Sequence, residues 1–265
     1  MEKEKGKKVL TVGIDRNPYH DNADLFDTDE IVLEPGVTVL CGCNGSGKTT
    51  LLGEIAKGLG YRPGGERMDR LRKAVETIGG GADGGQFDGK DGGAEPPAAI
   101  VVPWNAVKGR ENFLSDAASV LDPVGMSLGF EIRDSSEGEG TMMVLGQLAR
   151  SIGRKVASAE SPDSPLVLLI DAVDSGLDEA NMSEFRGFIG FLAEQAKGDG
   201  RGFHCVVSTN SWPMTQEWEK EAGLEPRCVL VPSLEPFETP DYPTWRRVML
   251  DCAKRKAKRD KKNRR

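Results

Sequence analysis

The chain has 265 residues, 38% of them hydrophobic, and a formal net charge of −7, so it is long enough to bury a proper core. No apolar run approaches the roughly 18 residues that a membrane-spanning helix needs, and residues 1 to 8 lack the apolar segment of a secretory signal. We therefore expect one α/β domain over residues 1 to 250, without a transmembrane segment and with a cytoplasmic location.

The five cysteines are odd in number and have no C-x-x-C spacing, which argues against a disulfide framework or a zinc site. We expect them to be reduced, with Cys41 and Cys205 in the core because both lie in apolar stretches. Cys41 and Cys43 also leave open an oxidation-sensitive site.

The first elements are short strands. Residues 8 to 14 alternate between apolar and polar positions, residues 15 to 29 are acidic and loop-like, and strands at 30 to 33 and 37 to 40 flank a Pro-Gly turn. This order predicts an antiparallel start to the fold.

A phosphate-binding motif follows, because residues 42 to 49 read Gly-Cys-Asn-Gly-Ser-Gly-Lys-Thr and match G-x-x-x-x-G-K-[ST] at every fixed position. A buried strand precedes the motif and an amphipathic helix over 49 to 59 follows it, as a phosphate loop requires. Glycines let successive N–H groups converge on one anion, Lys48 supplies a charge for the β- and γ-phosphates, and the Thr49 hydroxyl suits Mg²⁺. The expected nucleotide-binding residues of this loop are Gly42, Asn44, Gly45, Ser46, Gly47, Lys48, Thr49 and Thr50.

Aromatic residues before the loop offer a contact for the base of a nucleotide. Tyr19 or Phe26 is placed to stack on an adenine ring, with a preference for Tyr19; packing on their own domain is the alternative.

Residues 79 to 93 contain eight glycines in fifteen positions and predict a flexible surface loop. Residues 98 to 102 then form a short apolar run suited to a central strand. Asn105 follows this strand and is a candidate Mg²⁺ ligand, ahead of Gln86 in the glycine-rich loop.

Two further segments end or begin in polar residues. Residues 134 to 140 are acidic and hydroxyl-bearing and precede an amphipathic helix over 141 to 152, whose start either binds a phosphate or is simply capped. A fully apolar strand over 165 to 170 ends in Asp171, which matches the carboxylate that holds Mg²⁺ in phosphate-loop proteins; capping the next helix is the alternative.

The last buried strand, residues 203 to 209, follows a helix over 178 to 196 and ends in Asn210. Because carboxyl ends of parallel strands meet at one edge of a sheet, Asn210 is expected at the ligand edge.

The C-terminal part begins with a short strand at 227 to 231 and continues in a helix from about Thr244. Residues 252 to 265 carry nine Lys or Arg and one Asp, a net of +8, which leaves −15 on the rest of the chain. We treat residues 251 to 265 as a basic tail, and residues 254 to 265 contact nucleic acid, an acidic protein surface or their own domain, or remain solvated.

Five features together resemble the ATP-binding cassette (ABC) ATPases over about residues 30 to 215. These are the loop at 42 to 49, Ser-Ser-Glu-Gly-Glu at 135 to 139, Asp171, Ser-Gly-Leu-Asp at 175 to 178, and Asn210. The resemblance implies a P-loop NTPase fold of the ABC ATPase type, with a mixed central sheet flanked by helices, that binds ATP and Mg²⁺.

The resemblance further implies an ATP-dependent homodimer with a head-to-tail arrangement. Ser136, Gly138 and Glu139 take the signature positions that contact ATP bound to the other subunit, and Asp178 helps the two halves to communicate.

Departures from the family pattern affect the expected chemistry. Ala172 occupies the place of the family's general base, Asn210 that of its switch histidine, and Ser135 and Glu137 alter the signature. We expect slow hydrolysis in which Lys48, Asp171, Asp174 and Asn210 act and Asp174 orients the water. A nucleotide-gated binding module without useful hydrolysis is the alternative.

The biological setting follows only from the resemblance. The basic tail and unusual signature favour the family's soluble branch, which includes DNA maintenance, repair and mobile-element proteins, over an ATP-binding subunit of a membrane transporter.

Overall fold

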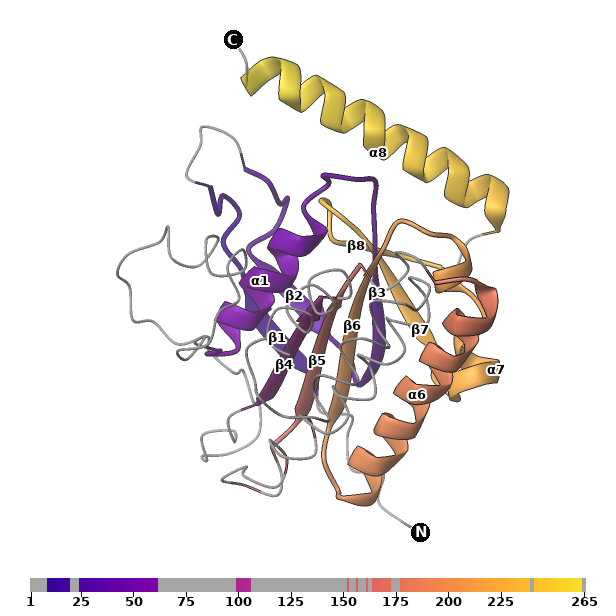
Figure 1. The fold of residues 1–265 in the computed structure, drawn as a ribbon. Coiled ribbons are helices and arrows are strands. Elements are labelled where there is room, and N and C mark those ends of the chain that lie inside the picture. Colours follow the sequence, from indigo (N-terminus) through magenta and orange to yellow (C-terminus); the bar gives the residue numbers. More distant parts are fainter. Residues whose placement is uncertain are drawn as a thin grey trace, which may run out of the picture.

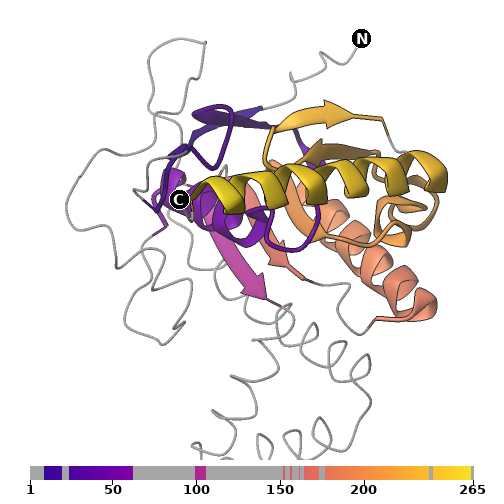
Figure 2. The same ribbon diagram turned by 90° about the horizontal axis from the view of Figure 1, so that it is seen from above.

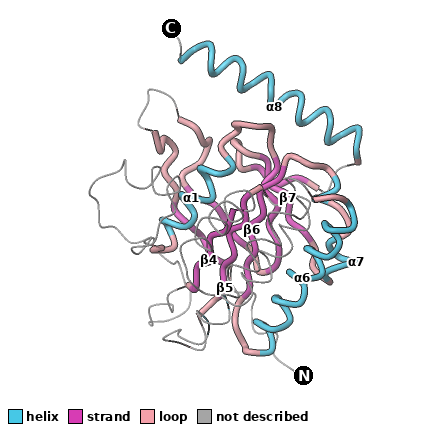
Figure 3. Tube along the Cα trace, viewed as in Figure 1, coloured by secondary structure: helices cyan, strands magenta, loops and turns pink. Residues whose placement is uncertain are grey.

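The computed structural model describes residues 9–19, 24–61, 99–105, 152, 156, 161, 164–172, 177–238 and 241–263. Within them, a six-stranded mixed sheet has the order β4-β5-β6-β3-β7-β8, and a separate two-stranded sheet joins β1 and β2 (Figure 1). Helices cover the faces of the larger sheet (Figure 3). This mixed α/β architecture agrees with the expected fold class.

The small sheet pairs β1 (Leu10–Gly13) antiparallel with β2 (Glu30–Leu33). The expectation that the next strand would continue this antiparallel start was wrong. β3 (Gly36–Cys41) instead lies inside the larger sheet, parallel to both of its neighbours. The physical reason is its composition, because all five residues after Gly36 are buried, as in a strand covered on both faces.

Parallel strands make up most of the larger sheet. β4 (Ile100–Asn105), β5 (Leu166–Asp171), β6 (Phe203–Thr209) and β7 (Pro226–Leu230) run parallel to β3, and the short edge strand β8 (Glu235–Phe237) is antiparallel to β7. Every residue of β5 and β6 is buried, which agrees with their apolar runs. The carboxyl ends of β3, β5 and β6 therefore meet at one edge.

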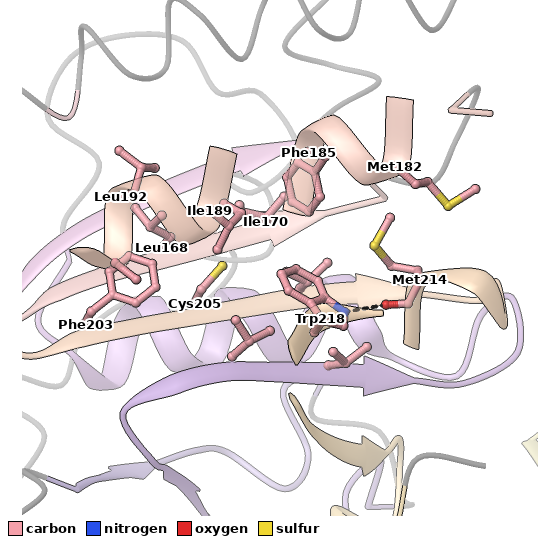
Figure 4. Close-up of a cluster of buried hydrophobic side chains, with 14 of the residues drawn as sticks. Leu168, Ile170, Met182, Phe185, Ile189, Leu192, Phe203, Cys205, Met214 and Trp218 are labelled. Atoms are coloured by element: carbon pink, nitrogen blue, oxygen red, sulfur yellow. Dashed lines mark hydrogen bonds between the residues drawn. The ribbon is translucent and has the colours of Figure 1, made fainter. Parts of the chain in front are cut away.

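Helix α1 (Lys48–Gly58) covers one face of the larger sheet together with β1 and β2, and α6 (Glu179–Gly198) covers the other. β5 serves both faces, since Leu168 and Ile170 pack toward α6 whereas Val167 and Leu169 pack toward α1. Figure 4 shows Leu168 and Ile170 beside the α6 side chains. Side chains that point alternately to the two faces of β5 thus join the α1 layer, the sheet and the α6 layer.

Short helices close one end of the α6 face. η1 (Pro213–Thr215) and α7 (Trp218–Ala222) bring in Trp218, whose indole N–H donates to the Met214 carbonyl at 2.7 Å (Figure 4). Arg186 of α6 is buried and pairs with Glu221 of α7. This pair fixes the position of α7, because separating it would leave the buried charge of Arg186 uncompensated.

The C-terminal helix α8 (Tyr242–Asn263) lies across the end of the domain near the loop that joins β3 to α1 (Figures 1 and 2). Trp245 and Cys252 are buried, and Met249 packs against the core. The predicted division at residue 250 falls within this helix. Among the described helices, none is long and apolar enough to cross a membrane.

His204 on β6 is buried, and we expect it to make the domain less stable in mild acid. The ring is 1% exposed and its Nδ1 lies 3.1 Å from the Glu34 carbonyl, and burial lowers its pKa from 6.5 to about 4. The unfolded chain therefore binds a proton below pH 6.5 that the folded chain binds only near pH 4. Stability contributed by neutral His204 is complete above pH 6.5 and declines as the pH falls toward 4.

We expect the free energy of unfolding to fall by about 2 kcal/mol between pH 7.5 and 5.0 through this residue alone. Urea unfolding of the native protein and His204→Gln at both pH values checks this. Carboxyl groups titrate in both proteins, so the difference between them isolates His204. An equal loss of stability in the variant would contradict the assignment.

Candidate nucleotide-binding site

A pocket of about 490 Å³ lies at the edge where the parallel strands end. Its walls come from the segment after β1, the loop between β3 and α1, and the ends of β5 and β6. The lining residues are Tyr19, Leu25, Asn44, Gly45, Gly47, Lys48, Thr49, Thr50, Asp171, Ala172, Ser208, Thr209 and Asn210. The structure thus brings together the phosphate loop, Asp171 and Asn210, although Thr49 and Asp171 are 122 positions apart and Asn44 and Asn210 are 166 apart.

The loop between β3 and α1 has backbone geometry that only glycine adopts readily. Gly45 and Gly47 have φ values of 73° and 107°. A Cβ on Gly42 would meet the Val231 carbonyl oxygen at 2.9 Å, so packing also demands glycine there. No side chain caps the start of α1 at Gly47, and an uncapped helix N-terminus is a favourable position for an anion.

Lys48 reaches back over this loop from the first position of α1. Its ammonium group donates hydrogen bonds to the carbonyl oxygens of Gly42, at 2.6 Å, and Cys43, at 3.1 Å. These bonds hold the charge of Lys48 above the loop and against the pocket that it lines. A phosphate in the loop would lie next to a fixed positive charge.

The polar centre of the pocket is Asp171 at the end of β5. Thr49 donates from Oγ1 to Asp171 Oδ2 at 2.8 Å, and Ser208 donates from Oγ to Oδ1 at 2.5 Å. The carboxylate is only 6% exposed. Two residues predicted as Mg²⁺ ligands from distant motifs therefore touch, and a third group fixes the carboxylate.

This donor set fits Mg²⁺. A hydroxyl and a carboxylate are the hard oxygen ligands that Mg²⁺ prefers, and the ion usually combines one or two protein groups with water and substrate phosphates. Among the described residues, no cluster of three His, Cys, Asp or Glu is able to hold a metal by itself. Thr49 and Asp171 would hold the ion, with phosphate and water completing its shell.

Asn105 is the last residue of β4 and Asn210 directly follows β6, at the same edge of the sheet. The backbone of Asn105 at the end of β4 lies in register with Asp171. The Asn210 side chain donates from Nδ2 to Asn44 Oδ1 at 2.6 Å, which ties the end of β6 to the phosphate loop.

The two aromatic candidates for the base differ in position. Tyr19 is 59% exposed, lines the pocket and has its hydroxyl 2.5 Å from Thr50 Oγ1. Phe26 is 0% exposed and packs in the core beside α1. The alternative that Phe26 stacks on a base was therefore wrong, because its ring faces the core.

Ala172 follows Asp171 in an unusual backbone conformation. Its φ is 54°, its N–H donates to Ser208 Oγ at 3.0 Å, and it lines the pocket. The position at which the family resemblance expects a glutamate thus carries a methyl group beside the proposed Mg²⁺ ligands. A non-glycine residue in the left-handed region is a feature typical of functional sites.

Several predicted residues lie outside the described residues. They are Asp174, Gln86 and the three signature positions, Ser136, Gly138 and Glu139. Asp178 is described, and its carboxylate caps α6 by accepting a hydrogen bond from the Asn181 N–H at 2.8 Å.

Sequence reasoning missed Ser208 and the contact of the C-terminal helix with the phosphate loop. Ser208 belongs to the polar end of β6, of which only Asn210 was selected. Cys252 of α8 donates from Sγ to Cys43 Sγ in the phosphate loop at 3.0 Å and accepts from the Cys43 N–H at 3.4 Å. The available signal was the helical spacing of Trp245, Met249 and Cys252, which marks one buried face.

Comparisons with known proteins give distant structural likeness only. No family model and no curated protein matches the chain. The dimeric structure of MJ0796, a bacterial ABC transporter cassette, is 13% identical, with a TM-score of 0.41, over 88% of this chain and 100% of the other. Stu0660 of Streptococcus thermophilus is 11% identical, with a TM-score of 0.38, over 86% of this chain and 76% of the other.

The fold follows from the chain's own geometry. A central strand leads through a glycine-rich loop into a helix, and a parallel strand two places along the sheet ends in a carboxylate that bonds to the loop threonine. This is a P-loop NTPase arrangement, with a mixed central sheet and helices on its faces.

Proposed function

We propose that this protein binds Mg-ATP at the loop from Gly42 to Thr49 and hydrolyses it slowly, as an ATPase of the ABC type. The observation that carries the proposal is the 2.8 Å hydrogen bond between Thr49 and Asp171. A hydroxyl and a carboxylate from distant motifs meet beside an uncapped helix N-terminus and a lysine. That combination of groups is suited to binding a triphosphate and its metal ion.

Each residue has a separate task in this proposal. Lys48 neutralises charge on the β- and γ-phosphates, and the N–H groups of the glycine loop hold phosphate oxygens. Thr49 and Asp171 hold Mg²⁺, which when bound supplies positive charge to the transferred phosphate. Ser208 keeps the Asp171 carboxylate in place. Asn105 is a further proposed ligand of the ion, because its strand ends in register with Asp171.

Orientation of the attacking water is assigned to Asp174 and Asn210. Asn210 is already placed at the pocket by its bond to Asn44. Neither group is the strong base that sits directly after the metal carboxylate in the resembled family, since Ala172 occupies that position. Slow turnover follows, because phosphoryl transfer still proceeds through positioning and charge neutralisation.

A second candidate is a nucleotide-gated binding module that does not turn over usefully. Ala172 favours it, because a methyl group lies beside Asp171 where a carboxylate would activate water. Both candidates share the binding of Mg-ATP and differ only in the chemical step.

The proposed assembly is a head-to-tail homodimer that forms around ATP. Ser136, Gly138 and Glu139 would contact the nucleotide of the other subunit, and Asp178 would connect the two sites. The proposed setting is cytoplasmic, in DNA maintenance, repair or a mobile element, with the basic residues 254 to 265 as the contact for nucleic acid. The alternative is an ATP-binding subunit of a membrane transporter.

The test is phosphate release from Mg-ATP, with and without DNA, alongside ATP affinity measured by calorimetry. The native protein is compared with Lys48→Ala and Asp174→Ala. We expect Lys48→Ala to lose binding and turnover, and Asp174→Ala to lose turnover while retaining binding. If the native protein binds ATP yet releases no more phosphate than Lys48→Ala, the binding module replaces the enzyme. Undetectable binding by the native protein would overturn both candidates.

A further inference from the structure

Helix α8 packs against the phosphate loop along one face. Trp245, Met249, Cys252 and Lys256 recur at spacings of four, three and four residues, which places them on one side of a helix. The first three contact the core or the loop. The Cys252 sulfur also lies 3.7 Å from the Val231 carbonyl oxygen, beside Gly42. The helix is therefore anchored one turn before Lys256.

Lys256 extends from this anchored face onto the loop itself. A Cβ built on Gly45 would lie 2.7 Å from Lys256 Nζ and 2.9 Å from its Cε. The ammonium group thus rests against the Cα of Gly45, a residue that lines the nucleotide pocket. Glycine is needed at this position for its φ of 73°, and the absence of a Cβ leaves room for the Lys256 ammonium group.

Electrostatics in the loop agrees with this placement. Burial, together with the neighbouring Cys252 thiol, raises the pKa of the Cys43 thiol to about 11, and the charges of Lys48 and Lys256 both oppose that rise. Two ammonium groups, one from the start of α1 and one from α8, therefore act on the same loop.

Lys256 has no carboxylate partner within the part of the chain that the structure describes. Lys254, on another side of the same helix, pairs with Asp251 at 3.1 Å. Lys256 is half-buried, so its charge is less hydrated than that of an exposed lysine. A half-buried cation beside a loop built to bind an anion is stabilised when that anion arrives.

We propose that Lys256 is a second cationic ligand of the nucleotide's β- and γ-phosphates, supplied by the C-terminal helix. This inference rests on the proposed function, since it concerns the same pocket. Lys48 contacts the phosphates from the start of α1, and Lys256 contacts them from α8, past Gly45. The flexible stem of a lysine lets its ammonium move from the rim at Gly45 onto a bound phosphate. The nucleotide then links the loop to α8.

The proposal predicts a dependence on phosphate number. Lys256 interacts with the charge at the β- and γ-positions and not with the base or ribose. Loss of Lys256 should therefore weaken the binding of a triphosphate most and the binding of a monophosphate least. If Lys256 only held α8 in place, its loss would weaken the binding of all nucleotides alike.

The experiment measures the affinities of ATP, ADP and AMP, with Mg²⁺, for the full-length protein by calorimetry. Lys256→Ala should bind ATP about tenfold more weakly and AMP less than about twofold more weakly. Lys256→Arg should recover ATP affinity to within about threefold of native, because it keeps the charge. Lys258→Ala is the matched control, since Lys258 is exposed on the same helix, and it should bind ATP like the native protein.

The inference fails by itself if Lys48→Ala loses ATP while Lys256→Ala binds it normally. Equal weakening of ATP and AMP in Lys256→Ala also overturns it, because α8 packing and not phosphate charge would then be affected. If the native protein binds no nucleotide, the inference falls together with the proposed function.

A second measurement checks that α8 stays docked in each variant. Cys43 and Cys252 lie 3.0 Å apart, so diamide at pH 8.5 should join them in a disulfide while the diamide takes up two electrons and two protons. Lys256→Ala should form the cross-link at the native rate. A variant that loses ATP affinity and also fails to cross-link would overturn the proposal, because displacement of the helix would explain the loss.

Discussion

Asp171→Asn is expected to remove the Mg²⁺ dependence of ATP binding and to lower phosphate release by about a hundredfold or more. The carboxylate accepts hydrogen bonds from Thr49 at 2.8 Å and from Ser208, so both of its oxygens are held in the pocket. An amide of the same size keeps one oxygen but loses the negative charge. It also places an NH₂ group toward one hydroxyl donor, which disrupts the site locally.

ATP affinity measured in Mg²⁺ and in EDTA checks this expectation. The native protein should bind more tightly with Mg²⁺, whereas Asp171→Asn should bind equally in both. Ser208→Ala serves as the matched variant, because it removes the hydrogen bonds of Ser208 to Asp171 and Ala172 and leaves the carboxylate. The affinity of this variant for ATP in Mg²⁺ should fall by less than about tenfold. Retention of the full Mg²⁺ effect in Asp171→Asn would exclude this residue as a metal ligand.

Ala172→Glu is expected to raise the rate of ATP hydrolysis by about a hundredfold, the range of a well-placed general base. Residue 172 lines the pocket directly after Asp171, so a carboxylate there would reach the water that attacks the phosphate. The backbone already has a φ of 54° at this position with alanine in place. A glutamate adds little further strain, and the N–H bond to Ser208 is a backbone contact that the change preserves.

The comparison that decides this point is between Ala172→Glu and Ala172→Gln, which have nearly the same size but differ in charge. Steady-state phosphate release is measured for both and for the native protein, together with ATP affinity. Glutamine should leave turnover near native. If the two variants hydrolyse ATP at the same rate, the missing carboxylate does not limit the reaction, and the water must be positioned elsewhere.

Much of the fold was predictable because local patterns have local causes. The apolar runs that became β5 and β6 are buried at every position, and the glycine spacing of the phosphate loop matches its positive φ values. Asp171 and Asn210 were expected at one edge because they follow parallel strands. Both residues meet the phosphate loop because the order of the strands places their ends beside it.

The partners of each strand and the directions of the side chains were harder to predict from the sequence. β3 was assigned to an antiparallel start, yet it pairs with β6 and β7, because the choice of partner depends on which distant strands bury its two faces. Phe26 was predicted as an alternative residue for stacking on a base, but it lies in the core. Ser208 was not predicted as a site residue, although it donates a hydrogen bond to Asp171. A sequence pattern indicates that a residue is buried or polar without saying what it faces.

The sequence by itself determined the phosphate loop, the strand that carries Asp171 and the helical form of the C-terminal segment, since each depends on neighbouring residues. Only the tertiary structure decided that α8 lies on that loop, where Cys252 meets Cys43 across 209 positions and Lys256 rests on Gly45. Helical spacing fixes which side of α8 is buried. The surface that receives that side is assembled from distant parts of the chain, so it exists only once the sheet has formed.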